Sequence, residues 1–328
     1  ITDERFVFNP FILKVAQDLK IVLIDLPVEK LPGFHHFLSS WLIIDESSSR
    51  TILIDVGPVS SVPVLVQSIE AVGVSKLDFI LLTHVHLDHS GGLGHLLKKF
   101  ESAKVLAHPK GKKHLLNPKR LWESSVEVLG DVALAYGRPI PAEESSFLPD
   151  EACLEGIKKI ETPGHASHHY SFLYEAESNL LFAGEAAGTY YKRGFAYPGP
   201  DNGTFILRPA TPLKFYLQSA LSSIRKLKSL KADVLCYAHF GYTTEVLKFL
   251  DLGEKQLLLW DALIRDYISK YEGVAIMPEN MAEYLLQKDP LLADFSNLPK
   301  DIKIREEENI LSSVRGFLDY VFQNTKAS

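Results

Sequence analysis

Residues 78–90 read Asp-Phe-Ile-Leu-Leu-Thr-His-Val-His-Leu-Asp-His-Ser, and the rest of the chain is interpreted from this stretch. Its apolar run, Phe79 to Leu82, predicts a short buried strand because polar residues bound it on both sides. Four side chains that can bind metal ions follow within six residues: His84, His86, Asp88 and His89. A helical pattern then begins at Leu93, so these side chains lie where the chain leaves a strand and enters a helix.

Such a turn can fold back so that His84 and His86 point one way and Asp88 and His89 another. This arrangement suits two adjacent divalent metals with nitrogen and oxygen ligands. The alternative is a histidine-rich surface loop, or a lone metal site made of two histidines. The pattern His-x-His-x-Asp-His after an apolar strand resembles the metallo-β-lactamase fold superfamily of hydrolases.

Three further clusters follow predicted strands in the order that this resemblance implies. They are Thr162-Pro-Gly-His165, then Glu185 after the apolar run that begins at Leu180, and then His239. The resemblance covers about residues 20 to 241 and implies an α+β fold. We expect a four-layer αββα sandwich of two mixed β-sheets, with metals at one rim. The predicted division is a catalytic domain over residues 1–242 and a C-terminal helical region, 243–328, packed on it.

The resemblance also implies the metal ligands. One ion would be held by His84, His86 and His165, and a second by Asp88, His89 and His239. Relatives normally bridge both metals with an aspartate, but this chain has Glu185 at that place. Its extra methylene leaves open the metal–metal distance and even the presence of two metals. Zn²⁺ is the simplest ion, and iron or manganese also accept imidazole and carboxylate ligands.

Several other residues near these clusters allow two interpretations. Asp55 ends a predicted strand and either shapes a turn or orients a histidine ligand from behind. His168 and His169 have no ligand role in the resemblance, so they either pack or support a ligand. We interpret three more histidines as surface or packing residues: His35, His36 and His108.

The stretch from Ala186 to Leu213 is long and aromatic for a simple connection. It lies beside Glu185, so it could form a wall of the substrate pocket. Tyr190 or Tyr191 would then be catalytic and donate a hydrogen bond to an oxyanion. The alternative is that these aromatic rings only pack the loop against the protein.

The C-terminal part carries two apolar helix faces, which predict docking or core surfaces. Their residues are Leu257, Trp260, Ile264, Tyr267, Ile268 and Tyr271 on one helix, and Ile310, Val314, Phe317 and Val321 on another. We expect Glu306 to Glu308 near the start of the second helix, where anions are favoured. An appended helical region is similar to that of glyoxalase II-like relatives.

Composition limits the possible partners. The chain has 328 residues, 46% of them hydrophobic, and a net charge of −6. A nucleic-acid partner is not expected, because such proteins usually carry a basic face. Only Cys153 and Cys236 are present, which favours a reducing cytoplasm over a disulfide framework. No signal peptide or membrane span is evident, so we expect a soluble protein that is not exported and has no membrane partner. The expected partner is a small-molecule substrate.

These ligands predict hydrolysis by a metal-bound hydroxide. Divalent metals lower the pKa of bound water from 15.7 towards ~7, which supplies a nucleophile at neutral pH. Asp88 could also carry a proton to the leaving group. The expected substrate is a carboxylic ester, thioester or lactone. The alternatives are a phosphodiesterase that processes RNA, an iron-dependent oxidoreductase similar to persulfide dioxygenases, and a non-catalytic metal-binding module.

Overall fold

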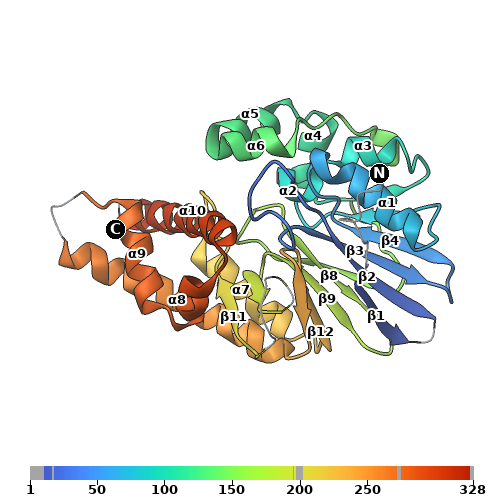
Figure 1. Ribbon diagram of the computed structural model, residues 1–328. Helices are drawn as coiled ribbons and strands as arrows, with labels where there is room; N and C mark the ends of the chain where they lie inside the picture. Colours follow the sequence, from blue (N-terminus) through green and yellow to red (C-terminus); the bar gives the residue numbers. More distant parts are fainter. Residues whose placement is uncertain (1–10, 17, 195, 197–201, 272–274, 326–328) are drawn as a thin grey trace, which may run out of the picture. The chain divides into compact units, whose positions relative to one another are not determined.

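The structure is a computed structural model that describes residues 11–16, 18–194, 196, 202–271 and 275–325 (Figure 1). It divides into two compact units, and each is described here by itself. Unit 1 comprises residues 1–31 and 37–152, and unit 2 comprises residues 32–36 and 153–328. The sequence predicted a different kind of division, between a catalytic domain that ends at residue 242 and an appended helical region. That division stays a prediction.

Unit 1 contains a six-stranded sheet with the order β1-β2-β3-β4-β5-β6. Its strands are β1 (Phe11–Ala16), β2 (Leu19–Asp25), β3 (Ser39–Asp45), β4 (Arg50–Ile54), β5 (Phe79–Leu81) and β6 (Lys104–Leu106). The first four strands pair antiparallel, whereas β4, β5 and β6 are parallel, so the sheet is mixed. Leu53 pairs with Ile80 in this parallel part, and both are fully buried.

The helices of unit 1 follow its strands. They are η1 (Val59–Ser61), α1 (Val62–Ala71), α2 (Leu87–Ser90), α3 (Leu93–Leu97), α4 (Pro109–Leu116), α5 (Lys119–Leu129), α6 (Asp131–Tyr136) and η2 (Glu144–Ser146). Three of them, α4, α5 and α6, follow one another between Pro109 and Tyr136. Gly130, with φ 53°, separates α5 from α6, and Figure 1 shows these two helices side by side in green.

Unit 2 contains a five-stranded sheet with the order β13-β12-β9-β8-β7. Its strands are β7 (Ile157–Glu161), β8 (Tyr170–Tyr174), β9 (Leu180–Gly184), β12 (Val234–Tyr237) and β13 (Gly241–Thr243). β8 is antiparallel to both β7 and β9, and β12 is parallel to β9, so this sheet is also mixed (Figure 1). The strands β7, β9 and β12 therefore run in one direction, and their carboxyl ends share one edge.

The predicted loop after Glu185 is a β-hairpin in the structure. β10 (Thr189–Lys192) pairs antiparallel with β11 (Phe205–Arg208), which gives backbone hydrogen bonds to a stretch that the sequence marked as irregular. Residues 195 and 197–201 of this stretch lie outside the described part of the chain. The hairpin fixes which side chains of the stretch face the interior of unit 2.

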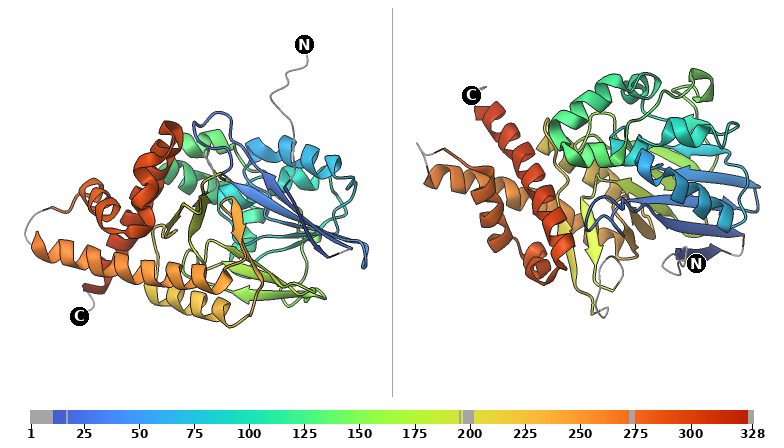
Figure 2. Two further views of the ribbon diagram at one scale, coloured as in Figure 1. Left: turned by 60° about the horizontal axis from the view of Figure 1, so that its bottom comes forward. Right: turned by 45° about the horizontal axis from the view of Figure 1, so that its top comes forward.

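The helices of unit 2 are α7 (Leu217–Lys228), α8 (Val246–Lys270), α9 (Pro278–Lys288), η3 (Pro290–Asn297) and α10 (Lys300–Thr325). α7 lies against α8, and α10 contacts α8 and α9 (Figure 2). The centres of both predicted apolar faces are buried, as Trp260 and Phe317 show. α10 begins at Lys300, so the prediction that Glu306 lies near the start of this helix is wrong. None of the described helices has both the length and the apolar character that crossing a membrane requires.

Candidate metal centre

The histidine-rich loop of unit 1 follows the carboxyl end of β5. After Leu82 and Thr83, His84 brings its Nε2 atom to 3.0 Å from Nδ1 of His86. Ligand atoms on one tetrahedral metal, each about 2.0–2.1 Å from the ion, lie roughly 3.3 Å apart. The two imidazole nitrogens are therefore spaced like neighbouring ligands of one ion.

The other two ligand candidates of this loop lie in the short helix α2. Nε2 of His89 is 3.4 Å from Oδ2 of Asp88, which is again close to the separation of two ligands of one ion. His89 is buried, and the Asp88 side chain is 20% exposed. A carboxylate at this position is both available as a ligand and accessible from solvent.

Asp55 supports this loop from below. Its Oδ1 accepts a hydrogen bond from the backbone N–H of Thr83, and its Oδ2 accepts one from the Thr83 hydroxyl, both at 2.7 Å. Oδ2 also lies 3.1 Å from Nδ1 of His89. With Nδ1 donating to this carboxylate, Nε2 of His89 is left to bind a metal. This contact fits the orienting role that the sequence left open for Asp55, and that role stays a prediction.

In unit 2 the carboxyl ends of three strands, β7, β9 and β12, bring three ligand candidates together. His165 follows β7, Glu185 follows β9 directly, and His239 follows β12. The turn before His165 needs a glycine, because Gly164 has φ 147° and a Cβ atom there would lie 2.6 Å from Cα of Ala220 in α7. Only a residue without a side chain allows α7 to approach this turn so closely.

Glu185 points its carboxylate toward both histidines of unit 2. Oε2 lies 2.9 Å from Nε2 of His165, and Oε1 lies 3.0 Å from Nε2 of His239. Burial alone would raise the pKa of Glu185, but the neighbouring His165 and His239 hold this pKa well below its usual value. Glu185 is therefore a carboxylate with a different imidazole facing each oxygen, which is the donor geometry that a bridging ligand needs.

His169 links the two ligand-bearing turns of unit 2. Its Nε2 accepts a hydrogen bond from the backbone N–H of Glu185 at 3.2 Å, and its Nδ1 lies 2.8 Å from Oγ1 of Thr162. The backbone N–H of Thr162 in turn donates to the His169 carbonyl. Of the two interpretations left open by the sequence, support of a ligand fits His169, which is buried, while His168 is only half-buried.

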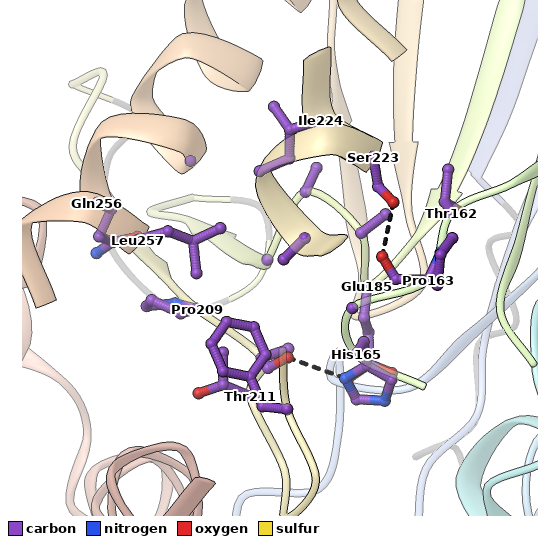
Figure 3. Close-up of a pocket in the computed structure, with 18 residues that line it drawn as sticks. Thr162, Pro163, His165, Glu185, Pro209, Thr211, Ser223, Ile224, Gln256 and Leu257 are labelled. Atoms are coloured by element: carbon purple, nitrogen blue, oxygen red, sulfur yellow. Dashed lines mark hydrogen bonds and ion pairs between the residues drawn. The ribbon is translucent and has the colours of Figure 1, made fainter. Parts of the chain in front are cut away.

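His165 is oriented by a backbone atom that the sequence does not reveal. The carbonyl oxygen of Ala210 accepts a hydrogen bond from Nδ1 of His165 at 3.0 Å, which Figure 3 draws as a dashed line from the His165 ring. This bond fixes the tautomer that leaves Nε2 for a metal. The adjoining cavity has a volume of about 20 Å³, enough for on the order of one water molecule.

Tyr190 and Tyr191 are both buried in unit 2. The Tyr190 ring stacks on Tyr237 at 5.2 Å between centroids, and the Tyr191 ring lies 4.9 Å from the Arg305 guanidinium. Burial raises the pKa of the Tyr191 hydroxyl. These contacts favour the packing interpretation, and the oxyanion role stays a prediction.

The remaining histidines and cysteines have other surroundings. His35 and His36 are exposed, and the His36 ring lies 4.9 Å from that of Phe240. His108 caps α4 by accepting a hydrogen bond from the backbone N–H of Lys110. Cys153 is exposed and Cys236 is buried, and both are free thiols.

The donor set fits divalent metal ions. Imidazole nitrogens and carboxylate oxygens suit zinc, iron and manganese, and three of the histidines, His84, His89 and His165, have a partner on their second nitrogen. Within the described residues, seven side chains belong to clusters that could hold metal ions: His84, His86, Asp88 and His89 in unit 1, and His165, Glu185 and His239 in unit 2.

Comparison with known proteins agrees with this donor set. The family model described as "Metallo-beta-lactamase superfamily" matches residues 36–239. Metallo-beta-lactamase fold-containing protein ST1585 of Sulfurisphaera tokodaii is 33% identical over 222 residues, 63% of this chain and 74% of the relative. A hydroxyacylglutathione hydrolase of Prochlorococcus marinus (strain MIT 9301) is 28% identical over 214 residues, 65% of this chain and 69% of the relative.

Solved structures show the same similarity. The crystal structure of ST1585 aligns with a TM-score of 0.59 and 26% identity, covering 90% of this chain and 98% of that one. The metallo-beta-lactamase family protein TTHA1429 from Thermus thermophilus aligns with a TM-score of 0.62 and 20% identity, covering 95% of each chain. The second structure supports the fold alone.

Proposed function

Because the chain belongs to the metallo-β-lactamase superfamily, we propose that it is a metal-dependent hydrolase of a carboxylic ester, thioester or lactone. The observation that carries this proposal is the Glu185 carboxylate, whose oxygens face His165 and His239 at 2.9 and 3.0 Å. A buried carboxylate between two imidazoles, at the carboxyl ends of neighbouring strands, supplies the oxygen and nitrogen ligands that divalent cations bind.

The proposed ligand sets are those implied by the family resemblance. His84, His86 and His165 would bind one ion, Asp88, His89 and His239 a second, and Glu185 would bridge the two. Zn²⁺ is the proposed ion. The 3.0 Å separation of the His84 and His86 nitrogens and the Asp55 contact to His89 support the unit 1 part of both sets.

When bound, a divalent metal lowers the pKa of water to about 7 and so supplies a nucleophile at neutral pH. Groups of the protein itself would transfer the proton and orient the ligands. Asp88 is the proposed proton carrier, because its carboxylate is partly exposed beside His89. Asp55 and Ala210 hold two of the imidazoles in the tautomer that presents Nε2.

The class of substrate is proposed from the relatives. Hydroxyacylglutathione hydrolases are named for cleaving a thioester, and one of them aligns with 65% of this chain. An ester, thioester or lactone carbonyl is attacked by the same nucleophile and loses an oxygen or sulfur leaving group. We propose a small-molecule substrate within this class.

The test combines metal analysis with a substrate panel. Protein purified without oxygen should contain close to two divalent ions per chain and hydrolyse a thioester, lactone or carboxylic ester. His84→Ala and His239→Ala should lower metal content and abolish turnover, whereas His35→Ala, at an exposed histidine, should change neither. Full metal content and activity in both ligand variants would reject the ligand sets. Oxygen consumption with ferrous iron, without hydrolysis, would favour the oxidoreductase alternative.

A further inference from the structure

We propose that the C-terminal helix α10 is a positioning element for the metal ligand His165, acting through residues 208–212. The proposal rests on the proposed metal-binding function and adds to it. It gives the helical region a role in the metal site that does not require any contact between this region and the substrate. His165, residues 208–212 and α10 all belong to unit 2.

Helix α10 holds residues 208–212 by two reciprocal hydrogen bonds. The Ser313 hydroxyl donates to the Pro209 carbonyl, and the Thr211 hydroxyl donates to the Ser313 carbonyl, both at 2.9 Å. All three residues are buried or nearly so, which makes these bonds costly to lose without replacement. Ser313 of α10 therefore bonds to both neighbours of Ala210, to the backbone carbonyl of Pro209 and to the side-chain hydroxyl of Thr211.

The helix also touches this segment directly. Gly316 lies so close that a Cβ atom there would be 1.9 Å from the Thr211 carbonyl oxygen and 2.5 Å from that of Pro212. Atoms at such distances overlap, so any side chain at residue 316 must push the helix and the segment apart. Gly316 is thus the point at which the spacing between α10 and the segment is set.

A buried ion pair anchors the start of the segment. Arg208 donates from Nε to Oε2 of Glu306 at 2.7 Å, and Arg305 donates to the other carboxylate oxygen at 2.8 Å. Arg208 and Glu306 are 4% and 1% exposed, so both charges depend on each other for compensation. This pair holds the end of β11, and with it the start of residues 208–212, against α10.

Between these anchors, Ala210 makes a hydrogen bond to a proposed metal ligand. Its carbonyl accepts the hydrogen bond from Nδ1 of His165, while Nε2 of the same ring lies 2.9 Å from Oε2 of Glu185. A shift of the segment by about 1 Å would break a hydrogen bond of 3.0 Å. The ring of His165 would then be free to rotate or to change tautomer, and its metal would be held less tightly.

The test uses cobalt(II) as the probe, because its absorption spectrum reports ligand geometry. The variants are Thr211→Val with Ser313→Ala, which removes both hydrogen bonds with little change of volume, and Gly316→Ala, which forces the segment away. Leu285→Val in α9 is the control, since Leu285 is fully buried in the same helical region and its side chain forms no hydrogen bond. Cobalt affinity is measured by chelator competition, together with the spectrum and the melting temperature.

We expect about tenfold weaker binding of one cobalt ion in the double variant and a larger loss in Gly316→Ala, with an altered spectrum in both. Leu285→Val should lower the melting temperature and leave affinity and spectrum unchanged. If Gly316→Ala does not fold, the double variant decides. Wild-type affinity and spectrum in that variant overturn the positioning role alone, while a wild-type protein that binds no metal overturns the proposed function as well.

Discussion

Nε2 of His239 lies 3.0 Å from Oε1 of Glu185, although 54 residues separate them along the chain. The contact follows from the parallel pairing of β9 with β12, which ends both strands at one edge. The side chain after each strand end then meets its neighbour across the edge. The same edge receives His165 from β7, so one sheet presents all three ligand candidates of unit 2.

Glu185→Gln should lose at least one metal and most activity. A carboxylate offsets the repulsion between two dications about 3.5–4 Å apart, and an amide does not. Glu185→Asp keeps the charge but shortens the reach to two histidines, so it should retain at least one metal and lose turnover. Metal content and turnover are measured on each variant. A fully active Glu185→Gln enzyme would remove this residue from the ligand set.

Asp55→Asn should lower the affinity for the metal bound by His89 about 10–100-fold. This is the usual loss when the hydrogen-bond partner of a histidine ligand is removed. The amide keeps the size of the side chain but not the charge beside Nδ1. Asp45→Asn is the matched control, because Asp45 is also buried in unit 1. Its carboxylate accepts hydrogen bonds from hydroxyl groups of a surface turn. Equal metal affinities in both variants would assign Asp55 to the turn alone.

His169→Phe should lower metal content and turnover while the protein stays folded. Phenylalanine fills the space of the imidazole but accepts no hydrogen bond from the backbone N–H of Glu185. We expect a loss within the same range of about 10–100-fold, because the backbone that carries Glu185 loses its partner. Circular dichroism and metal analysis are the measurements. Unchanged metal affinity would show that His169 only packs.

Tyr190→Phe and Tyr191→Phe separate the two interpretations of these rings. A donor to an oxyanion contributes about 10²–10³-fold to turnover. Because both rings are buried, we expect each variant to change the melting temperature. We expect turnover to fall by less than about 10²-fold. Turnover is measured on every accepted substrate. A loss of about 10²-fold with unchanged metal content would restore the catalytic role.

Glu306→Gln should destabilise the protein at pH 7 by about 3–5 kcal/mol, because Arg208 and Arg305 are left buried without their carboxylate. Burial alone would raise the pKa of Glu306, but the two arginines lower it from 4.5 to about 2. Its stabilising effect is therefore complete above pH 4.5 and is lost as the pH falls toward 2.

Urea unfolding at several pH values measures this effect. The difference between wild type and Glu306→Gln should shrink as the pH falls below 4.5. Glu245→Gln is the control, because its pair with Lys248 is about half exposed and such pairs contribute roughly 0–1 kcal/mol. A difference that stays constant with pH would show that the Glu306 charge does not stabilise the fold.

The ligand-bearing turns could be predicted because their residue types are informative where they stand. Three histidines and an aspartate after an apolar strand, or Thr-Pro-Gly before His165, have few structural explanations. The orienting atom of Ala210 could not be predicted, because every residue has a backbone carbonyl. Glu306 looked like a helix-terminus residue, because only the packed structure reveals the partner 98 residues away, Arg208. The hairpin β10–β11 was missed because several glycines and prolines lie in the sequence between its two short strands, and these residues favour irregular backbone.

The link between α10 and residues 208–212 has a consequence for synthesis of the protein. In the sequence, 104 residues separate Pro209 from Ser313. At roughly 5–20 residues per second, a ribosome takes on the order of 5–20 s to add them. During that interval the nascent chain already carries His165, but the helix that secures residues 208–212 does not yet exist. If α10 positions His165 as proposed, the full metal affinity is reached only after the sheet strands of both units have been made.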